Sequence, residues 1–245
     1  IGKDAFKGCI SLEMIEIKNP ECKIDESYDT IPEKTEISGF SKSLAKTYSK
    51  KNHRNFKNIT NIYDNFFCGE ISMNKFSIPD DVEAIGDNAF KGCVNLQEIH
   101  LGNVASIGKG AFADCVSLEY GRDFSKKQAG ALEIPASVKK IGENAFLNDK
   151  KIAQMKFEGK DTIIENKTAI DENTLIGCYA ESLIYDFAKE NKYKTVLLIG
   201  FDDETEFGIT GDYKNNTEIK AIIIGNKIDK IDEFAFAGCA GLEYV

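Results

Sequence analysis

Residues 78–101 read Ile-Pro-Asp-Asp-Val-Glu-Ala-Ile-Gly-Asp-Asn-Ala-Phe-Lys-Gly-Cys-Val-Asn-Leu-Gln-Glu-Ile-His-Leu, and this phrase decides the fold because it recurs along the chain. Shorter copies with the same Ala-Phe centre begin at Ile1, Ile107, Ile141 and Ile231. Five copies of so long a phrase do not arise by chance. Self-similarity at a fixed period of 20–50 residues is typical of stacked repeat proteins, so the sequence predicts a repeat array.

Each part of the phrase has a physical interpretation. Leu96-x-x-Ile99-x-Leu101 places apolar groups at the alternating positions of a short, half-buried strand. Ile85-Gly86 predicts a second short extended piece, and we expect its glycine to permit a turn. The Phe of Ala-Phe-x-Gly-Cys is a large wedge that one unit cannot bury by itself. We therefore expect an α/β solenoid of roughly ten stacked rungs, at about 22–23 residues each.

Two stretches, 37–59 and 176–198, depart from the phrase and resemble each other. In both, a leucine and an aromatic residue lie four positions apart, which places them on one face of a helix. Each stretch is predicted to be a variant rung with a helix of about three turns. The expected N-caps are Ser43 and Ser182, and the expected left-handed helix ends are Asn52 and Asn191. The distance of about 140 residues between them suggests a higher-order duplication.

The repeat spacing also predicts the organisation of the chain. Residues 1–200 form a first repeat block that contains both variant rungs, residues 201–218 an irregular connecting rung, and residues 219–245 the start of a further block. Both ends fall inside the repeat pattern, so we expect an array that is truncated at both ends. The segment 120–131 is an insertion, because Phe112 and Phe146 are separated by 34 positions instead of 22.

The phrase at 78–101 resembles the repeat of BspA-type leucine-rich repeat surface proteins, also called the Treponema pallidum type. The resemblance implies a right-handed solenoid with a parallel sheet on its concave side and short convex helices. It also implies a secreted or surface-attached protein, often bacterial, that acts in adhesion. The family defines no catalytic residues. Asp114 in place of Gly, Asn148-Asp149 in place of Gly-Cys, and Ile224-Gly225 without Pro depart from the family pattern.

The charge of the chain argues against a nucleic-acid partner, and its hydropathy argues against a membrane-spanning segment. The 245 residues carry a formal net charge of −9, and the only arginines are Arg54 and Arg122. A nucleic-acid partner is not expected, because binding to phosphates requires a basic face. No apolar run approaches the ~20 residues that span a bilayer, so no transmembrane segment is expected in this chain.

The residues that could carry chemistry are interpreted as structural. Cys9, Cys93, Cys115 and Cys239 share one repeat position, which predicts a ladder of small buried thiols. His53 and His100 are expected at the surface and are too few for a metal triad. The acidic segment that contains Asp202, Asp203, Glu204 and Asp212 lacks the spacing of a calcium loop. We therefore expect no catalytic, cofactor or metal site.

The strand positions that point away from the core are the remaining candidates for a site. The candidate partner-binding residues on this face are Gln97, Glu98, His100, Glu119, Tyr120, Gln154, Lys156 and Tyr244. Exposed tyrosine on a polar face is a common binding anchor. The alternative interpretation is a solvated face whose charges serve solubility, and the sequence leaves both open.

The repeat array, the lack of a catalytic motif and what the family resemblance implies lead together to a functional prediction. We expect a monomeric, non-enzymatic domain, extracellular or at the cell surface, that binds a protein or cell-surface ligand in adhesion to host or neighbouring cells. The alternative is a structural spacer that holds another domain away from the cell.

Overall fold

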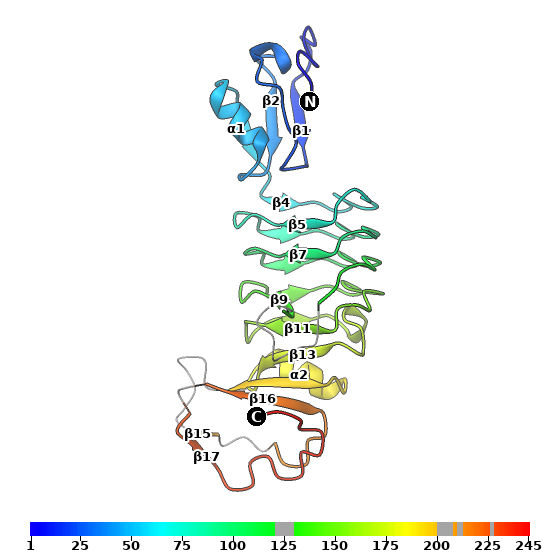
Figure 1. The fold of residues 1–245 in the computed structure, drawn as a ribbon, viewed down its shortest axis with the longest axis vertical. Coiled ribbons are helices and arrows are strands. Elements are labelled where there is room, and N and C mark those ends of the chain that lie inside the picture. Colours follow the sequence, from blue (N-terminus) through cyan, green and yellow to red (C-terminus); the bar gives the residue numbers. More distant parts are fainter. Residues whose placement is uncertain (121–129, 200–207, 210–212, 226–227) are drawn as a thin grey trace. The chain divides into compact units, whose positions relative to one another are not determined.

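The structure is a computed structural model that describes residues 1–120, 130–199, 208–209, 213–225 and 228–245 (Figure 1). Its internal contacts divide the chain into two units. Unit 1 comprises residues 1–62 and 79–83, and unit 2 comprises residues 63–78 and 84–245. In each unit, short parallel strands are stacked one rung upon another, as the repeat predicts.

Unit 1 has one three-stranded parallel sheet and one helix. Its elements are β1 (Met14–Ile17), the 3-10 turn η1 (Tyr28–Thr30), β2 (Glu36–Gly39), α1 (Leu44–Lys51), β3 (Phe56–Asn58) and β4 (Asn61–Ile62). The register aligns Ile15 with Ile37 and Ile37 with Phe56. These aligned side chains face a core to which the helix adds Ala45 and Tyr48.

Unit 2 has a row of longer strands, which we call the front strands. They are β5 (Lys75–Ser77), β7 (Glu98–His100), β9 (Leu132–Ile134), β11 (Gln154–Phe157), β13 (Leu175–Tyr179), β14 (Thr195–Ile199) and β16 (Ile219–Ile224). Strands β5 and β7 form one parallel pair, and the other five form a second parallel sheet in the order β9-β11-β13-β14-β16 (Figure 1).

A second ladder of two-residue strands runs along unit 2. It contains β6 (Ala84–Ile85), β8 (Ser106–Ile107), β10 (Lys140–Ile141) and β12 (Ile163–Ile164), all parallel. The other elements of the unit are the 3-10 turn η2 (Lys167–Ala169), the helix α2 (Leu183–Glu190) and the pair β15 (Gly208–Ile209) and β17 (Lys230–Ile231).

The glycines of the Ile-Gly phrase have a different role from the expected turn. Gly86, Gly108 and Gly142 are absent from the residues with positive φ. A Cβ atom on Gly108 would lie 2.5 Å from the carbonyl carbon of Gly86. The glycine is therefore required because the backbones of successive rungs touch at this point.

Both helices are shorter than expected. Each has eight residues, which is little more than two turns. The predicted N-caps are confirmed, since the Ser43 and Ser182 side chains accept hydrogen bonds from backbone N–H groups of the first turn. Asn52 and Asn191 are not left-handed: their φ angles are −102° and −98°.

The left-handed residue follows each asparagine by one position. His53 has a φ of 54° and Lys192 a φ of 60°. Asn52 and Asn191 instead donate from Nδ2 to the carbonyl oxygens of Tyr48 and Phe187, at 3.1 and 2.9 Å. The asparagine thus satisfies a carbonyl of the last turn with its side chain, and the next residue reverses the chain.

The phenylalanine wedges stack face to face along unit 2. The Phe90 and Phe112 ring centroids are 5.0 Å apart with 9° between the ring planes, and Phe112 lies 5.2 Å and 7° from Phe146. All three rings are buried. The backbone is stacked as well, because the Phe90 N–H donates to the Ala111 carbonyl at 2.7 Å. The stacked phenylalanine rings and the backbone hydrogen bond to the alanine therefore connect each rung to the next.

The cysteine ladder is confirmed at three positions and wrong at one. Cys93, Cys115 and Cys239 are buried free thiols, whereas Cys9 is exposed. The Cys115 thiol donates to the carbonyl oxygen of Phe90 in the preceding rung at 3.0 Å, and Cys93 bonds Phe67 in the same way. The neighbours of Cys9, Gly8 and Ile10, are exposed as well.

The predicted fold class, an α/β solenoid with parallel sheets and short helices, is confirmed. The predicted connecting rung at 201–218 lies largely outside the described residues, and the block boundaries of the array stay a prediction.

Candidate binding groove

The front strands of unit 2 are interrupted between β7 and β9. Strand β7 pairs with β5, and β9 pairs with β11, but no ladder joins β7 to β9 in the part of the chain that the structure describes. The repeat spacing explains the break. Leu96 precedes the strand residue Ile99 by three positions, whereas Leu118 precedes Leu132 by fourteen.

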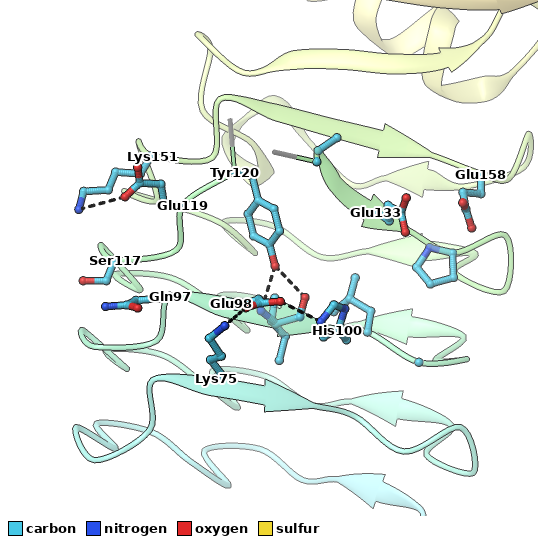
Figure 2. A pocket seen from close by; sticks show the side chains of 16 residues that line it. Lys75, Gln97, Glu98, His100, Ser117, Glu119, Tyr120, Glu133, Lys151 and Glu158 are labelled. Atoms are coloured by element: carbon cyan, nitrogen blue, oxygen red, sulfur yellow. Dashed lines mark hydrogen bonds and ion pairs between the residues drawn. The ribbon is translucent and has the colours of Figure 1, made fainter. Parts of the chain in front are cut away.

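Tyr120 occupies the interruption with its side chain (Figure 2). Its hydroxyl donates to the carbonyl oxygen of Ile99 at 2.7 Å and accepts from the Ile99 N–H at 2.9 Å. The phenol therefore bonds the two backbone groups of Ile99 that a neighbouring strand would otherwise pair.

The backbone of Tyr120 is bound on the opposite side. Its N–H donates to the carbonyl oxygen of Lys151 at 3.2 Å, and its carbonyl accepts from the N–H of Ala153 at 3.0 Å. Tyr120 also forms a parallel bridge with Ile152. The residue thus links the rung of β7 to the rung of β11, and the tyrosine ring is fixed at both ends.

A groove of about 850 Å³ opens where the strands separate (Figure 2). It is lined by parts of both front sheets and by the rung that carries Tyr120. Its charged and aromatic lining residues are Lys75, Glu98, His100, Glu119, Tyr120, Glu133, Lys151 and Glu158. Among the described residues, the lining has four carboxylates and two lysines, which gives this part of the groove a negative charge at neutral pH.

Three of the four carboxylates already have a cation. Glu98 pairs with Lys75 at 2.5 Å, Glu119 with Lys151 at 3.9 Å, and Glu158 with Lys156 at 3.4 Å. The hydrogen bond from Lys75 is the main reason that the pKa of Glu98 is lowered. The second carboxylate oxygen of Glu98 lies 3.0 Å from Nε2 of His100.

Glu133 differs from the other three. It is exposed between the buried residues Leu132 and Ile134 on β9, and it makes no ion pair with any residue that the structure describes. Burial raises the pKa of the Tyr120 hydroxyl to about 12. The negative charges of Glu98 and Glu133 add to this rise. The hydroxyl therefore keeps its proton and stays a donor to Ile99.

The groove brings together five of the eight candidate residues: Gln97, Glu98, His100, Glu119 and Tyr120. His100 is exposed, as expected, between the buried residues Ile99 and Leu101. Tyr120 differs from the expected exposed anchor, because its ring is half-buried and its hydroxyl is bound to the backbone.

The other three candidates lie outside the groove lining. Gln154 and Lys156 are half-buried on β11, where they alternate with the buried Met155 and Phe157. Tyr244 is 61% exposed and follows the rung of β16, where it bridges Ala221.

Four charged lining residues were not among the sequence candidates: Lys75, Glu133, Lys151 and Glu158. Glu133 lies on the front strand after the insertion at 120–131, at the outward position of its Leu-x-Ile pattern. The spacing of 34 positions between Phe112 and Phe146 was therefore the signal in the sequence that indicated an irregular rung at the groove.

The described residues contain no group of three metal-ligating side chains and no helix that is long and apolar enough to cross a membrane. The acidic segment with Asp202, Asp203, Glu204 and Asp212 lies outside the described residues. Cys22, Cys68 and Cys178 are free thiols like the other four cysteines. Burial raises the pKa of the Cys178 thiol to about 12, so this thiol stays protonated at neutral pH.

Comparison with solved structures found matches to three leucine-rich repeat proteins. The T. pallidum leucine-rich repeat protein TpLRR is 17% identical, with a TM-score of 0.44 over 85% of this chain and 78% of that one. A leucine-rich cell surface protein from Faecalibacterium prausnitzii is 18% identical, with a TM-score of 0.36 over 98% and 68% of the two chains. A leucine-rich-repeat protein from Bacteroides ovatus is 16% identical, with a TM-score of 0.24 over 99% and 68%.

None of the curated proteins matches the chain. The model of one protein family, the BspA type leucine-rich repeat region, matches six copies over residues 1–119, 60–175 and 210–245. These matches cover most of the chain and include the phrase at 78–101. The chain belongs to the BspA-type leucine-rich repeat family.

Proposed function

We propose that this chain is a non-enzymatic protein-binding domain and that its binding site is the groove between β7 and β9. The observation that carries the proposal is the interruption of the front strands at Tyr120. In a continuous sheet each strand covers the edge of the next, whereas the interruption opens a concave, polar space lined by two sheets. Concave sites of this size with a few fixed polar groups are typical of ligand binding.

The proposal includes an extracellular or cell-surface location in a bacterium and a role in adhesion. Support comes from the BspA-type family to which the chain belongs, because the resemblance to this family implies a secreted or surface-attached protein. The net charge of −9 favours a basic or polar protein surface over an acidic polymer as the ligand. We propose that the chain acts as a monomer.

A binding screen against arrays of extracellular proteins and glycans tests the proposal. The groove variant carries Gln97→Ala and His100→Ala, two exposed residues of the lining. The matched control carries Glu172→Ala and Glu190→Ala, which are exposed outside the groove. We expect a protein that binds the wild type and the control but loses at least tenfold in affinity for the groove variant. Equal binding by all three chains would remove the groove as the site.

The structural spacer is the second candidate, and one observation favours it. Charged side chains on the front strands are held in ion pairs, as Lys75 on β5 is with Glu98 on β7 and Lys220 on β16 is with Glu243. Such pairing serves a solvated face that binds nothing. A screen in which the wild-type chain binds no protein and no glycan would favour the spacer.

A further inference from the structure

We propose that the groove binds a cationic side chain, arginine or lysine, of the partner protein, with its charge beside Glu133 and its aliphatic stem along Tyr120. This inference rests on the proposed binding function and specifies the chemistry of the ligand.

The first argument is charge. Glu98, Glu119 and Glu158 share their charge with lysines, but Glu133 has no cation among the described residues. Glu133 and Tyr120 line the same groove (Figure 2). A cation that enters the groove would neutralise Glu133 without breaking an existing ion pair. An anion would instead meet described lining residues that include four carboxylates and two lysines.

The second argument is the rigidity of Tyr120. The backbone of this residue is bound to the rung of Lys151, and its hydroxyl is bound to Ile99 (Figure 2). The ring is therefore ordered before any ligand arrives, and binding costs little side-chain entropy. Aromatic rings attract guanidinium and ammonium groups and pack against the methylene groups that carry them.

The third argument is the mixture of surfaces. The half-buried apolar residues Ala131 and Pro135 line the same groove as the carboxylates. A small inorganic cation would make no use of these residues, whereas the stem of a lysine or arginine would cover them. The groove therefore favours a long cationic side chain over a free metal ion.

The test uses three peptides that differ at one position. They are acetyl-Gly-Ser-X-Ser-Gly-amide with X as arginine, citrulline or glutamate. Citrulline has the shape of arginine without its charge. Each peptide is titrated into the full, isotopically labelled chain, and the NMR signals of the Tyr120 ring and the Ile99 amide are followed. These two groups report on the groove because both residues line it and the Ile99 N–H is hydrogen-bonded to the Tyr120 hydroxyl.

We expect the arginine peptide to shift both signals in a saturable way and the citrulline and glutamate peptides to bind at least threefold more weakly. Glu133→Gln should weaken the arginine peptide about threefold to tenfold, as expected for one exposed ion pair with an aromatic contact. Glu133→Lys should abolish its binding. The control Glu172→Gln, an exposed residue outside the groove, should leave it unchanged.

Equal binding of the arginine and citrulline peptides, or an unchanged affinity in Glu133→Gln, would overturn the inference. So would a glycan that binds the groove and leaves these peptides without effect. The array screen could find a protein whose binding depends on Gln97 and His100 while the arginine peptide does not bind. In that case the inference of a cationic ligand is wrong and the proposed function stands. Because Glu133 is exposed on β9, its variants should fold, and unchanged melting temperatures would show this.

Discussion

At the scale of single residues, the departures from the repeat phrase are as informative as the matches. Asp149 stands at the position where other rungs have the buried cysteine. It is 1% exposed, and neither carboxylate oxygen has a hydrogen-bond partner. Burial is the main cause that raises the pKa of Asp149 to about 8, and the nearby charge of Asp114 contributes. A carboxylic acid has therefore replaced a thiol as the small protonated group in the core.

This replacement predicts that stability depends on pH. In the unfolded chain an aspartic acid ionises near pH ~3.9, whereas folded Asp149 keeps its proton up to about pH 8. Between these values the unfolded state binds fewer protons, so the free energy of unfolding falls as the pH rises from ~4 to ~8. The slope approaches ~1.4 kcal/mol per pH unit. Asp149→Asn and Asp149→Cys should abolish this decline.

Urea unfolding at several pH values from 4 to 9 measures the effect. Both variants should gain in midpoint over the wild type at pH 8, and the gain should shrink towards pH 4. The control Asp186→Asn changes an exposed aspartate on α2, and its pH profile should follow the wild type. A gain for Asp149→Asn that is the same at pH 4 and pH 8 would contradict the assignment.

The glycine of the phrase supports a second prediction at the residue scale. A Cβ on Gly108 would approach the backbone of the preceding rung to 2.5 Å, whereas a Cβ on Gly2, at the same repeat position, would have nothing within 4 Å. We expect Gly108→Ala to lower the free energy of unfolding by ~1–3 kcal/mol through overpacking. Gly2→Ala is the matched control and should change it by less than ~0.5 kcal/mol. Equal effects in urea unfolding would show that close approach is not the reason for the glycine.

At the scale of elements, the rungs are joined by side chains more than by long strands. The ladder β6-β8-β10-β12 has only two residues per strand, which is little pairing for a stable sheet. The stacked rings of Phe90, Phe112 and Phe146 provide the continuous apolar contact between these rungs.

Removing one ring tests this view. Phe112→Ala should lower the free energy of unfolding by about 3–5 kcal/mol, because the ring is fully buried and stacked on both faces. Phe6→Ala is the matched control at the same repeat position, where the ring is only partly buried, and it should cost clearly less. Melting of Phe112→Ala at the wild-type temperature would contradict the stacking argument.

At the scale of the whole molecule, the repeat, the buried face of each strand and the N-caps could be predicted from the sequence. All three depend on local spacing: the phrase displays the repeat and the buried face, and the variant rungs at 37–59 and 176–198 display the N-caps. The groove could not be predicted, because it depends on a tertiary contact: the hydroxyl of Tyr120 bonds the backbone of Ile99 in another rung. The insertion revealed only an irregular spacing. The division into two units was also hidden, since the phrase at 78–101 continues across both of them.

The suggested duplication has support in the residues that follow the two helices. Arg54 and Tyr193 stand at equivalent positions, 17 residues after Ile37 and Ile176. Arg54 Nη2 donates to the carbonyl oxygens of Tyr28 and Ile31 at 2.7 and 3.2 Å. The Tyr193 hydroxyl lies 3.0 and 2.9 Å from the equivalent carbonyl oxygens, those of Lys167 and Ile170. Two different side chains therefore form hydrogen bonds with the carbonyl oxygens of the equivalent 3-10 turn in the two copies.

This equivalence predicts that tyrosine can replace Arg54. The arginine is buried, and its Nε and Nη1 atoms lack hydrogen-bond partners, so it carries a desolvation cost that a tyrosine would avoid. We expect Arg54→Tyr to keep the free energy of unfolding within ~1 kcal/mol of the wild type. Arg54→Met leaves both carbonyls without a donor and should lower it by ~1–3 kcal/mol, as Tyr193→Phe should in the other copy. Urea unfolding of the three variants checks the prediction. If Arg54→Tyr is as damaging as Arg54→Met, the two turns are not held in the same way and the correspondence between the copies ends at the helices.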